Sequence, residues 1–319
     1  MKSNYSAHLT VCAFAYLQVH YEVMNVVYAY PDYYDEFKCT AGFCRHSCCV
    51  GWEIDIDDES LERFSKEDGA LGDELRKNIS LENGAHFVLG ENERCPFLDG
   101  KNLCRLITAK GEEYICEICR DHPRFRSFLP GRTEIGLGLC CEEAARIIIT
   151  KKTPFRIIES GENERDEETE NIVNGRQELL DIATDRSLDI NGRMRKMQEL
   201  YSPMAEKTPA QWAEFFLSLE RMDEAWTQQL EKLKNCEKFA VPNTLGYEQL
   251  LCYFLYRHVP ECYDDFDADS KILFAILSVQ ILSALNESGS TEELIELARL
   301  YSAEIEYSDE NPQKIYEVI

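Results

Sequence analysis

The distribution of cysteine along the chain is the feature that most restricts how this protein can fold. The chain holds 14 cysteines in 319 residues, and ten of them lie between Cys39 and Cys141. The three that follow, Cys236, Cys252 and Cys262, stand singly, and we expect them to be ordinary buried cysteines. One region therefore uses its thiols for coordination, cross-linking or catalysis, and the rest of the chain does not.

Within that region the cysteines recur at short spacings that suit coordination. The C-x2-C pair in "GEEYICEICRDHPRF" can direct two sulfurs at one ion, because both side chains emerge on one side of a turn or helix end. The stretch "LCCEEAARIII" predicts a helix that begins at Cys140 and Cys141, where the helix dipole favours the thiolate form that a metal requires. His122, three residues after Cys119, is either a further ligand or a histidine at a helix end.

Two interpretations compete for these thiols, a disulfide framework and a soft-metal site. Adjacent cysteines fit one disulfide framework poorly, and the N-terminus is not expected to be a secretory signal, so we expect a reducing compartment. Thiolate-rich sets select zinc or iron–sulfur clusters, and the sequence does not separate the two. Nine or ten thiols exceed one tetrahedral site, so either two sites exist or several cysteines only line one.

Composition divides the chain into four predicted parts. Residues 1–36 form an N-terminal extension and lead-in, and residues 37–150 form a cysteine-rich metal or iron–sulfur domain. Residues 151–175 form an acidic linker, because the run from Glu159 to Glu170 carries seven acids and one base. Residues 176–319 form a helical domain. Residues 1–23 are expected to be an upstream extension, with a short extra helix or strand as the alternative.

The expected fold class is α+β and mostly α, with short strands in the cysteine-rich domain. "GWEIDID" alternates like a half-buried strand with Trp52 on its inner face, and Tyr114 is also expected in the core. Asp57 or Asp58 caps the helix that follows, and the turn at Asp99-Gly100 predicts a hairpin. In the second half, apolar residues at three- and four-residue spacing predict helices over 208–222, 227–235, 246–259, 270–285 and 290–307.

The charge balance excludes two classes of partner. Lys and Arg number 34 against 59 Asp and Glu, which gives a formal net charge of -25. Nucleic acid and anionic membrane surfaces both attract basic proteins, so neither is expected as a partner. The most apolar stretch, residues 271–285, is shorter than a bilayer requires and predicts a buried core helix.

Several ordered blocks of this sequence resemble the flagellin lysine N-methylase family, and more broadly the cysteine-cluster proteins described as zinc or iron chelators. They include "PDYYDEFKC", "CRHSCCVGWEIDID", "RCPFLDGKNLCRL", "GEEYICEICRDHPRF", "EIGLGLCCEEAARIII" and "YEQLLCYFLYRHV". The resemblance implies a metal-ligand set of nine thiols: Cys39, Cys44, Cys48, Cys49, Cys95, Cys104, Cys116, Cys119 and Cys141. Cys140 is additional, since the family carries one cysteine at this point.

The resemblance also implies a cytoplasmic transferase that methylates lysines of flagellin with S-adenosylmethionine as donor. Its second cofactor would be zinc or an iron–sulfur cluster, expected as 4Fe–4S, which either binds the donor or is structural. Donor-binding and catalytic residues are not identified; Glu112, Glu113, Glu306 and Tyr307 are candidates for orienting or deprotonating the lysine. The rival hypothesis is a non-catalytic metal-binding or electron-transfer module that docks on a protein partner.

Overall fold

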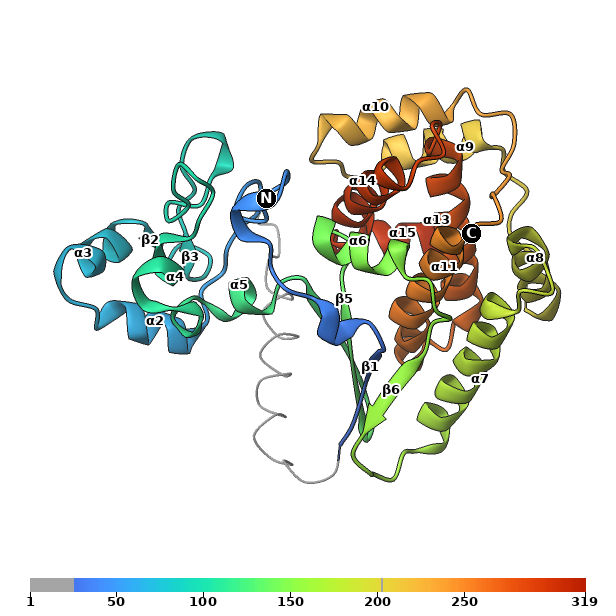
Figure 1. Cartoon of the computed structure of the whole chain (residues 1–319), viewed down its shortest axis with the longest axis horizontal. Helices are drawn as coiled ribbons and strands as arrows, with labels where there is room; N and C mark the ends of the chain where they lie inside the picture. Colours follow the sequence, from blue (N-terminus) through green and yellow to red (C-terminus); the bar gives the residue numbers. More distant parts are fainter. Residues whose placement is uncertain (1–25, 202) are drawn as a thin grey trace, which may run out of the picture.

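The computed structural model describes residues 26–201 and 203–319, so the predicted extension over residues 1–23 lies outside the described part of the chain. The fold is α+β and mostly helical, which confirms the predicted class (Figure 1). The strands are β1 (Val27–Pro31), β2 (Ile79–Ser80), β3 (His86–Phe87), β4 (Arg124–Leu129), β5 (Arg132–Leu137) and β6 (Ile157–Ser160). The α-helices are α2 (Asp58–Ser65), α3 (Gly69–Lys77), α4 (Arg105–Lys110), α5 (Glu117–Asp121), α6 (Glu142–Thr150), α7 (Glu167–Thr184), α8 (Ile190–Leu200), α9 (Pro209–Ser218), α10 (Glu224–Leu233), α11 (Leu245–His258), α12 (Cys262–Asp265), α13 (Ala268–Leu285), α14 (Thr291–Tyr301) and α15 (Asn311–Tyr316). Short 3-10 turns and one π-helical segment, η6 (Ser302–Glu306), complete the set.

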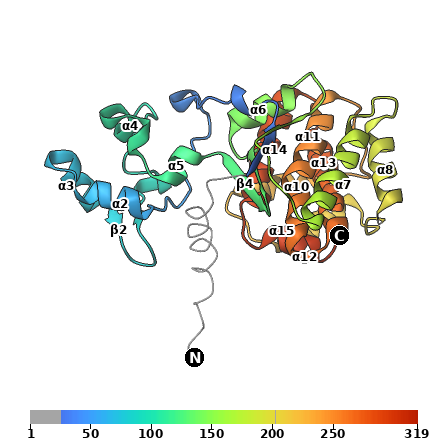
Figure 2. The same cartoon turned by 90° about the horizontal axis from the view of Figure 1, so that it is seen from below.

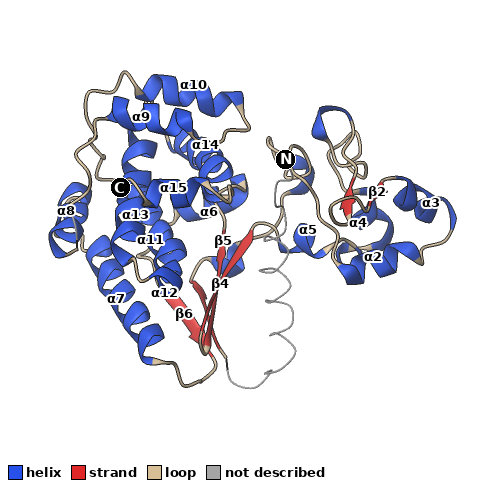
Figure 3. Ribbon diagram, turned by 180° about the vertical axis from the view of Figure 1, so that it is seen from behind, coloured by secondary structure: helices blue, strands red, loops and turns tan. Residues whose placement is uncertain are grey.

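A mixed sheet in the order β4-β5-β1-β6 organises the chain (Figure 3). β1 pairs in parallel with β5, from Val27 opposite Arg132 to Ala29 opposite Glu134, and antiparallel with β6. β4 and β5 form an antiparallel hairpin whose turn holds Gly131 at a φ of 70°. Because parallel neighbours require a long crossover, the chain leaves the sheet after β1 and returns at β4, and most of the cysteines lie in this excursion.

The excursion forms a small lobe, which we define as residues 49–121, beside the rest of the molecule (Figures 1 and 2). Its core comprises ten buried residues, two of which are cysteines: Ile54, Ile56, Phe64, Leu75, Phe87, Cys95, Phe97, Leu106, Ile115 and Cys116. Asp57 caps α2 by accepting from the Ser60 N–H at 2.8 Å, as predicted. The second oxygen of Asp57 accepts from the Glu117 N–H at 2.8 Å, so one carboxylate ties the starts of α2 and α5 together.

The large lobe, residues 26–37 and 122–319, has a separate apolar core of 53 buried residues. The helices α11 and α13 run through it, and nearly every side chain of α11 is buried. Among the described residues α13 alone is long and apolar enough to cross a membrane, but 78% of it is buried inside the protein. This burial agrees with the predicted core helix. Thr208 and Ser290 cap α9 and α14 as the sequence indicates.

A buried ionic cluster joins the sheet to the helices. Glu134 on β5 pairs with Arg132 on the same strand and with Arg176 on α7, whose Nη2 lies 2.6 Å from a carboxylate oxygen of Glu134. All three side chains are at most 1% exposed. The hydroxyl of Tyr256 on α11 also donates to the Ala29 and Ile135 carbonyls at 3.0 and 3.2 Å. The pairing of β1 with β5 is therefore secured by side chains of the helical lobe.

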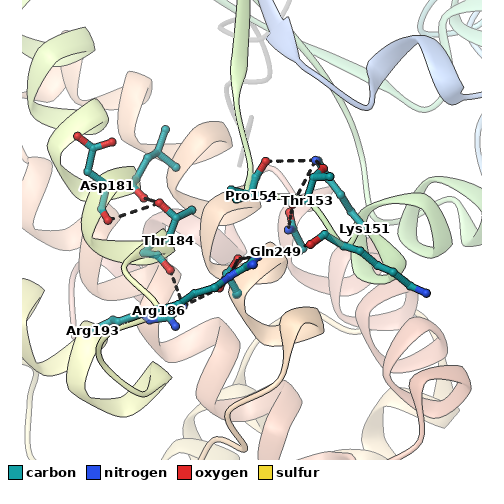
Figure 4. Close-up of polar contacts among 12 residues, drawn as sticks. Lys151, Thr153, Pro154, Asp181, Thr184, Arg186, Arg193 and Gln249 are labelled. Carbon is teal, nitrogen blue, oxygen red and sulfur yellow. Dashed lines mark hydrogen bonds and ion pairs between the residues drawn. The ribbon is translucent and has the colours of Figure 1, made fainter.

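The predicted acidic linker is more ordered than its composition suggests. Residues 157–160 form β6 and residues 167–184 form α7, although most side chains from Glu159 to Glu170 are exposed. Gln249 on α11 donates to the Thr153 carbonyl at 2.9 Å, and Lys151 bonds to the carbonyls of Thr153 and Pro154 (Figure 4). These contacts fasten the segment between α6 and β6 onto the large lobe; the four domain boundaries themselves stay a prediction.

Two local predictions for the small lobe are wrong in detail. Residues 51–57 form an isolated bridge at Asp55 rather than a strand, although Ile54 and Ile56 are buried on one side as predicted. The expected hairpin at Asp99-Gly100 is reduced to one bridge between Leu98 and Cys104. Strand pairing here competes with a tight turn in which Asp99 accepts from the Lys101 and Leu103 N–H groups at 2.7 and 2.9 Å. The turn still brings the chain around Cys104 back beside Cys95.

Candidate functional site

The thiol loop, residues 38–48, is held against the start of α6 by one carboxylate. Glu142, in the first turn of α6, accepts from the backbone N–H groups of Arg45 and His46 at 3.1 and 3.2 Å. The predicted helix over this segment is confirmed, with Cys141 at its N-cap. This contact joins residues nearly a hundred positions apart and places the loop cysteines beside Cys141.

Four thiols gather where the loop meets α6: Cys39, Cys44, Cys48 and Cys141, which we call the loop group. Burial raises the pKa of Cys141 to about 11, and the nearby thiols of Cys44 and Cys39 add to the rise against the effect of two backbone N–H groups. Cys44 lies 3.0 Å from the Thr40 hydroxyl, and the Ala41 N–H donates to the Cys39 sulfur at 3.4 Å. The group thus combines one end of a helix with one loop.

Five further thiols belong to the small lobe: Cys49, Cys95, Cys104, Cys116 and Cys119, which we call the core group. Cys95 and Cys116 are part of the buried core, and the other three pack against it. The Cys95 N–H donates to the Cys49 carbonyl at 2.8 Å, and the sulfurs of Cys116 and Cys119 are 3.5 Å apart. The C-x2-C spacing therefore directs its two sulfurs at one point, as the sequence indicates.

In two pairs of neighbouring thiols, Cys48 with Cys49 and Cys116 with Cys119, one thiol has a lower pKa than its partner. A hydrogen bond from Cys48 lowers the pKa of Cys49 to about 7, with help from Ser47 and Arg94. A hydrogen bond from Cys119 likewise lowers the pKa of Cys116. In both pairs the partner thiol acts as donor. A thiolate is the form of cysteine that binds metals, so each pair offers one sulfur that ionises readily.

The donor set fits a soft metal, whereas the arrangement of side chains does not by itself form a closed site. Every described cysteine is a free thiol, so the disulfide alternative finds no bridge in the described chain. Over residues 26–201 and 203–319, no three Cys, His, Asp or Glu side chains converge as a metal-binding group. The nine-thiol ligand set stays a prediction, supported by the chemistry of the donors and by their division into two groups.

A cavity of about 430 Å³ lies where the thiol loop and small lobe meet the large lobe. Cys48 and Trp52 line it from one side, and Cys140, Arg299 and Glu304 line it from the other. Trp52 was expected in the core, but it is half-buried because its ring forms part of this wall. Cys140, the cysteine outside the predicted ligand set, also faces this cavity.

A network of polar side chains lies behind the cavity wall. Tyr307 packs edge-on against Trp52 with ring centroids 5.5 Å apart, and the Arg257 guanidinium lies 4.9 Å from the Tyr307 ring. Arg257 donates to the Tyr253 hydroxyl at 2.8 Å, and Glu306 accepts from that hydroxyl at 3.1 Å. Burial opposes ionisation of Glu306, but Arg257 and His258 outweigh it and lower its pKa.

The four candidates for handling the lysine do not form one site. Glu306 is buried and engaged by His258, so it is placed to orient its neighbours rather than to meet a substrate. Tyr307 lies directly behind the cavity wall, and burial raises its pKa, which keeps its hydroxyl neutral. Glu112 and Glu113 are exposed on the small lobe, and the only described ion pair of Glu113 is with Arg120 at 4.0 Å.

His122, the segment from Met222 to Glu224, and Glu304 also line the cavity. His122 ends α5, as one of its two interpretations holds, and it also lines the cavity, with its ring 6.3 Å from Trp52. Burial lowers the pKa of His122 to about 4, so its ring is neutral. The lining residues from Met222 to Glu224 and Glu304 were missed, because nothing in their local spacing marks them as functional.

The region that holds these thiols matches a known protein family. Residues 38–133 match the CxxCxxCC family, whose description is "Putative zinc- or iron-chelating domain". The match is confined to the cysteine-rich region of the chain.

Part of this chain is also similar to curated proteins. The chain is 25% identical over 162 residues to a lysine-N-methylase of Salmonella choleraesuis, a match that covers 48% of this chain and 40% of the relative. A lysine-N-methylase of Salmonella typhimurium is 24% identical over the same length and coverage. The flagellar biosynthetic protein FliU of Salmonella muenchen is 27% identical over 129 residues, which is 37% of this chain and 75% of that protein.

These matches are partial. The chain spans about two fifths of the length of the two lysine-N-methylases. No solved structure matches this chain.

Proposed function

We propose that the protein is an S-adenosylmethionine-dependent protein-lysine N-methyltransferase with flagellin as substrate, and that its cysteines hold an iron–sulfur cluster or zinc. The observation that carries the proposal is the similarity over 162 residues to two proteins named lysine-N-methylase. The zinc- or iron-chelating region supports the metal, and the name of the flagellar relative supports the substrate. The working compartment would be the cytoplasm, with neither nucleic acid nor membrane as partner.

The reaction is an in-line displacement. The lone pair of a neutral lysine amine forms a bond to the methyl carbon, the carbon–sulfur bond breaks, and its electron pair stays on sulfur as S-adenosylhomocysteine. The nitrogen loses one proton to a base or to water. The protein must therefore desolvate the ammonium group and hold amine and sulfonium in near-attack geometry.

The residues around the cavity suit that task. The rings of Trp52 and His122 line one side of the cavity, and neutral Tyr307 and buried Glu306 lie behind that side. Three arginines line the cavity as well, but the acids Glu224 and Glu304 on its large-lobe side can attract a cationic methyl donor or lysine. Positioning of two reactants in this way accounts for a large part of the rate in reactions of this class.

The core group is the set that would hold a metal within the small lobe, and the loop group would hold one beside the cavity. A thiolate-bound metal would supply either a structural cross-link or an open coordination position next to the donor.

The proposal is tested by incubating anaerobically purified protein with S-adenosylmethionine and flagellin and locating modified lysines by mass spectrometry. We expect methyl groups on flagellin lysines, formed in step with S-adenosylhomocysteine. Heat-denatured protein and flagellin alone serve as controls. The absence of methylated lysine in flagellin, after incubation with protein whose metal content has been verified, would contradict the proposal.

One observation favours a second candidate. The family match covers the chelating region, residues 38–133, and leaves most of the large lobe outside it. A non-catalytic metal-binding or electron-transfer module would show this pattern, with the large lobe as the surface that docks a protein partner. Such a module would bind metal and flagellin without consuming S-adenosylmethionine.

A further inference from the structure

The cavity between the lobes has a composition that is unusual for this protein. Its lining comes from several separate parts of the chain: the thiol loop with the start of the small lobe, residues 93, 94 and 102, His122 and Cys140, the residues around the start of α10, and the segment from α14 into η6. Charged side chains of both signs face it together with an aromatic wall: Arg45, Arg94, Arg299, Glu93, Asp223, Glu224, Glu304, Trp52 and His122.

We propose that this cavity is the binding site of S-adenosylmethionine, with Trp52 against the adenine and Glu304 and Arg299 at opposite ends of the amino-acid portion. The proposal rests on the proposed function, because it identifies where the methyl donor of that reaction binds.

Size is the first argument. The cavity volume of about 430 Å³ lies within the range of about 300–1,000 Å³ that small-molecule sites occupy. An adenosyl ligand with its methionine portion is of drug-like size and would fill such a space. A single lysine side chain would leave most of it empty, so the cavity suits the donor better than the substrate amine.

The placement of charge is the second argument. Glu304 is only 3% exposed, and its two oxygens accept from the Met222 and Asp223 N–H groups at 2.9 and 2.8 Å. This carboxylate is therefore fixed in position before any ligand arrives. Arg299, five residues earlier in the chain, is held by Glu296 at 2.6 Å. A ligand that carries both an ammonium and a carboxylate matches a lining that supplies both a fixed acid and a fixed base.

The aromatic and apolar lining is the third argument. The Trp52 ring packs edge-on with the rings of Tyr307 and His122, so two contacts fix the indole that lines the cavity. Met222, which is 65% exposed, lies at the cavity edge, and Ala303 and Leu300 line its large-lobe side. Purine bases stack on such indole rings, and a sulfonium cation is attracted to an aromatic face.

Another cavity in the described part of the chain provides a contrast. It has a volume of about 550 Å³ but is lined only by residues of α8 and the turn before it, from Ser187 to Glu199. That lining has no aromatic ring and no cysteine. Volume alone therefore does not select the site between the lobes; the combination of aromatic wall, paired charges and neighbouring thiols does.

The test uses S-adenosylhomocysteine, the unreactive product, as probe. Its dissociation constant is measured by calorimetry for the anaerobically purified wild-type protein and for Ala303→Trp, in which an indole occupies the cavity. The matched control is Ala210→Trp, which places the same side chain at a half-buried alanine of α9 outside the cavity. Circular dichroism and metal content confirm that each variant folds.

We expect Ala303→Trp to weaken binding by at least about tenfold, Trp52→Ala to weaken it by about tenfold, and Ala210→Trp to leave it unchanged. Trp52→Phe should restore most of the loss, because it keeps an aromatic face. Wild-type binding that both cavity variants retain would overturn the assignment of the cavity while leaving the proposed function intact. Wild-type protein that binds neither the probe nor S-adenosylmethionine would overturn the proposed function as well.

A third outcome also decides the matter. If Ala303→Trp abolishes binding of a lysine-containing flagellin peptide but leaves probe binding unchanged, the cavity holds the substrate lysine and the donor assignment is wrong.

Discussion

The two lobes differ in what stabilises them. The large lobe buries 53 core residues, whereas the small lobe buries ten, including two cysteines, in a segment of about 70 residues. A core of that size rarely supplies more than about 3–5 kcal/mol without a metal or a disulfide, and the described cysteines form no disulfide. The large lobe is expected to fold by apolar packing, and the small lobe to depend on what its thiols bind.

The largest effect expected from this difference follows metal removal. Structural zinc contributes about 10–16 kcal/mol in small metal-dependent domains, so chelation should unfold the small lobe and leave the large lobe folded. Hydrogen exchange read by mass spectrometry should show lost protection in α2–α5 and retained protection in α11 and α13. Cys116→Ser should reproduce the loss, whereas Cys236→Ser, outside both thiol groups, should not. Equal loss in both lobes would contradict the division.

A smaller effect should come from the ionic cluster of the large lobe. Arg176→Ala leaves Glu134 buried with one fewer partner, and breaking a buried pair costs about 3–5 kcal/mol. Urea unfolding of the variant should show this loss. Lys314→Ala is the surface control, because Lys314 pairs with exposed Glu310 at 2.6 Å and should contribute at most about 1 kcal/mol. A loss of similar size in both variants would show that burial does not set the energy of these pairs.

Two helix caps allow a matched comparison between the lobes. Removal of the cap by Asp57→Ala or Thr208→Ala should cost about 0.5–2 kcal/mol in each case. Asp57 also holds the start of α5, next to Cys116, so only its variant should lower metal occupancy. Thermal unfolding and metal analysis of the two variants test this. Unchanged metal content in Asp57→Ala would show that the cap does not support the thiols.

The smallest effect concerns pH. Burial disfavours the charged form of His258, but Glu261 and Glu306 outweigh it and raise its pKa above the usual value of about 6.5. Arg257 and the Tyr316 hydroxyl also face this group. A raised pKa in the folded state stabilises the fold below pH ~6.5, and that stability is lost as the pH rises through the folded-state pKa.

Thermal unfolding of the large lobe should therefore occur at progressively lower temperature as the pH increases from about 6 toward alkaline values. His258→Gln should flatten this dependence while leaving the small lobe unaffected. A profile unchanged by the substitution would assign the pH dependence to other groups.

The sequence predicted the helices well because each carries its own local signals. Thr208-Pro209 marks the start of α9, Ser290 marks the start of α14, and the apolar spacing of residues 270–285 marks α13 as buried. These signals act within a few residues, so no tertiary information is needed to interpret them.

The sheet and the cavity were not predictable in the same way. β1 pairs with β5 across the whole small lobe, and no local pattern identifies that partner. Trp52 was expected in the core because it shares the alternating pattern of Ile54 and Ile56, yet it lines a cavity together with residues of α14 and η6, which are far away in the sequence. The cysteine spacing did predict that Cys116 and Cys119 meet, since their relation is set within one turn of helix.

The parallel pairing of β1 with β5 has a consequence for how the chain is made. During synthesis Val27 emerges early, yet its partner Arg132 appears only after every thiol of the small lobe and before Cys141. Contacts between distant parts of a chain form slowly, because the intervening segment must first be ordered. The five thiols of the core group are thus all synthesised before β1 can pair with β5 and before Cys141, the last member of the loop group, appears. We therefore expect that a metal held by the core group would be acquired before one held by the loop group.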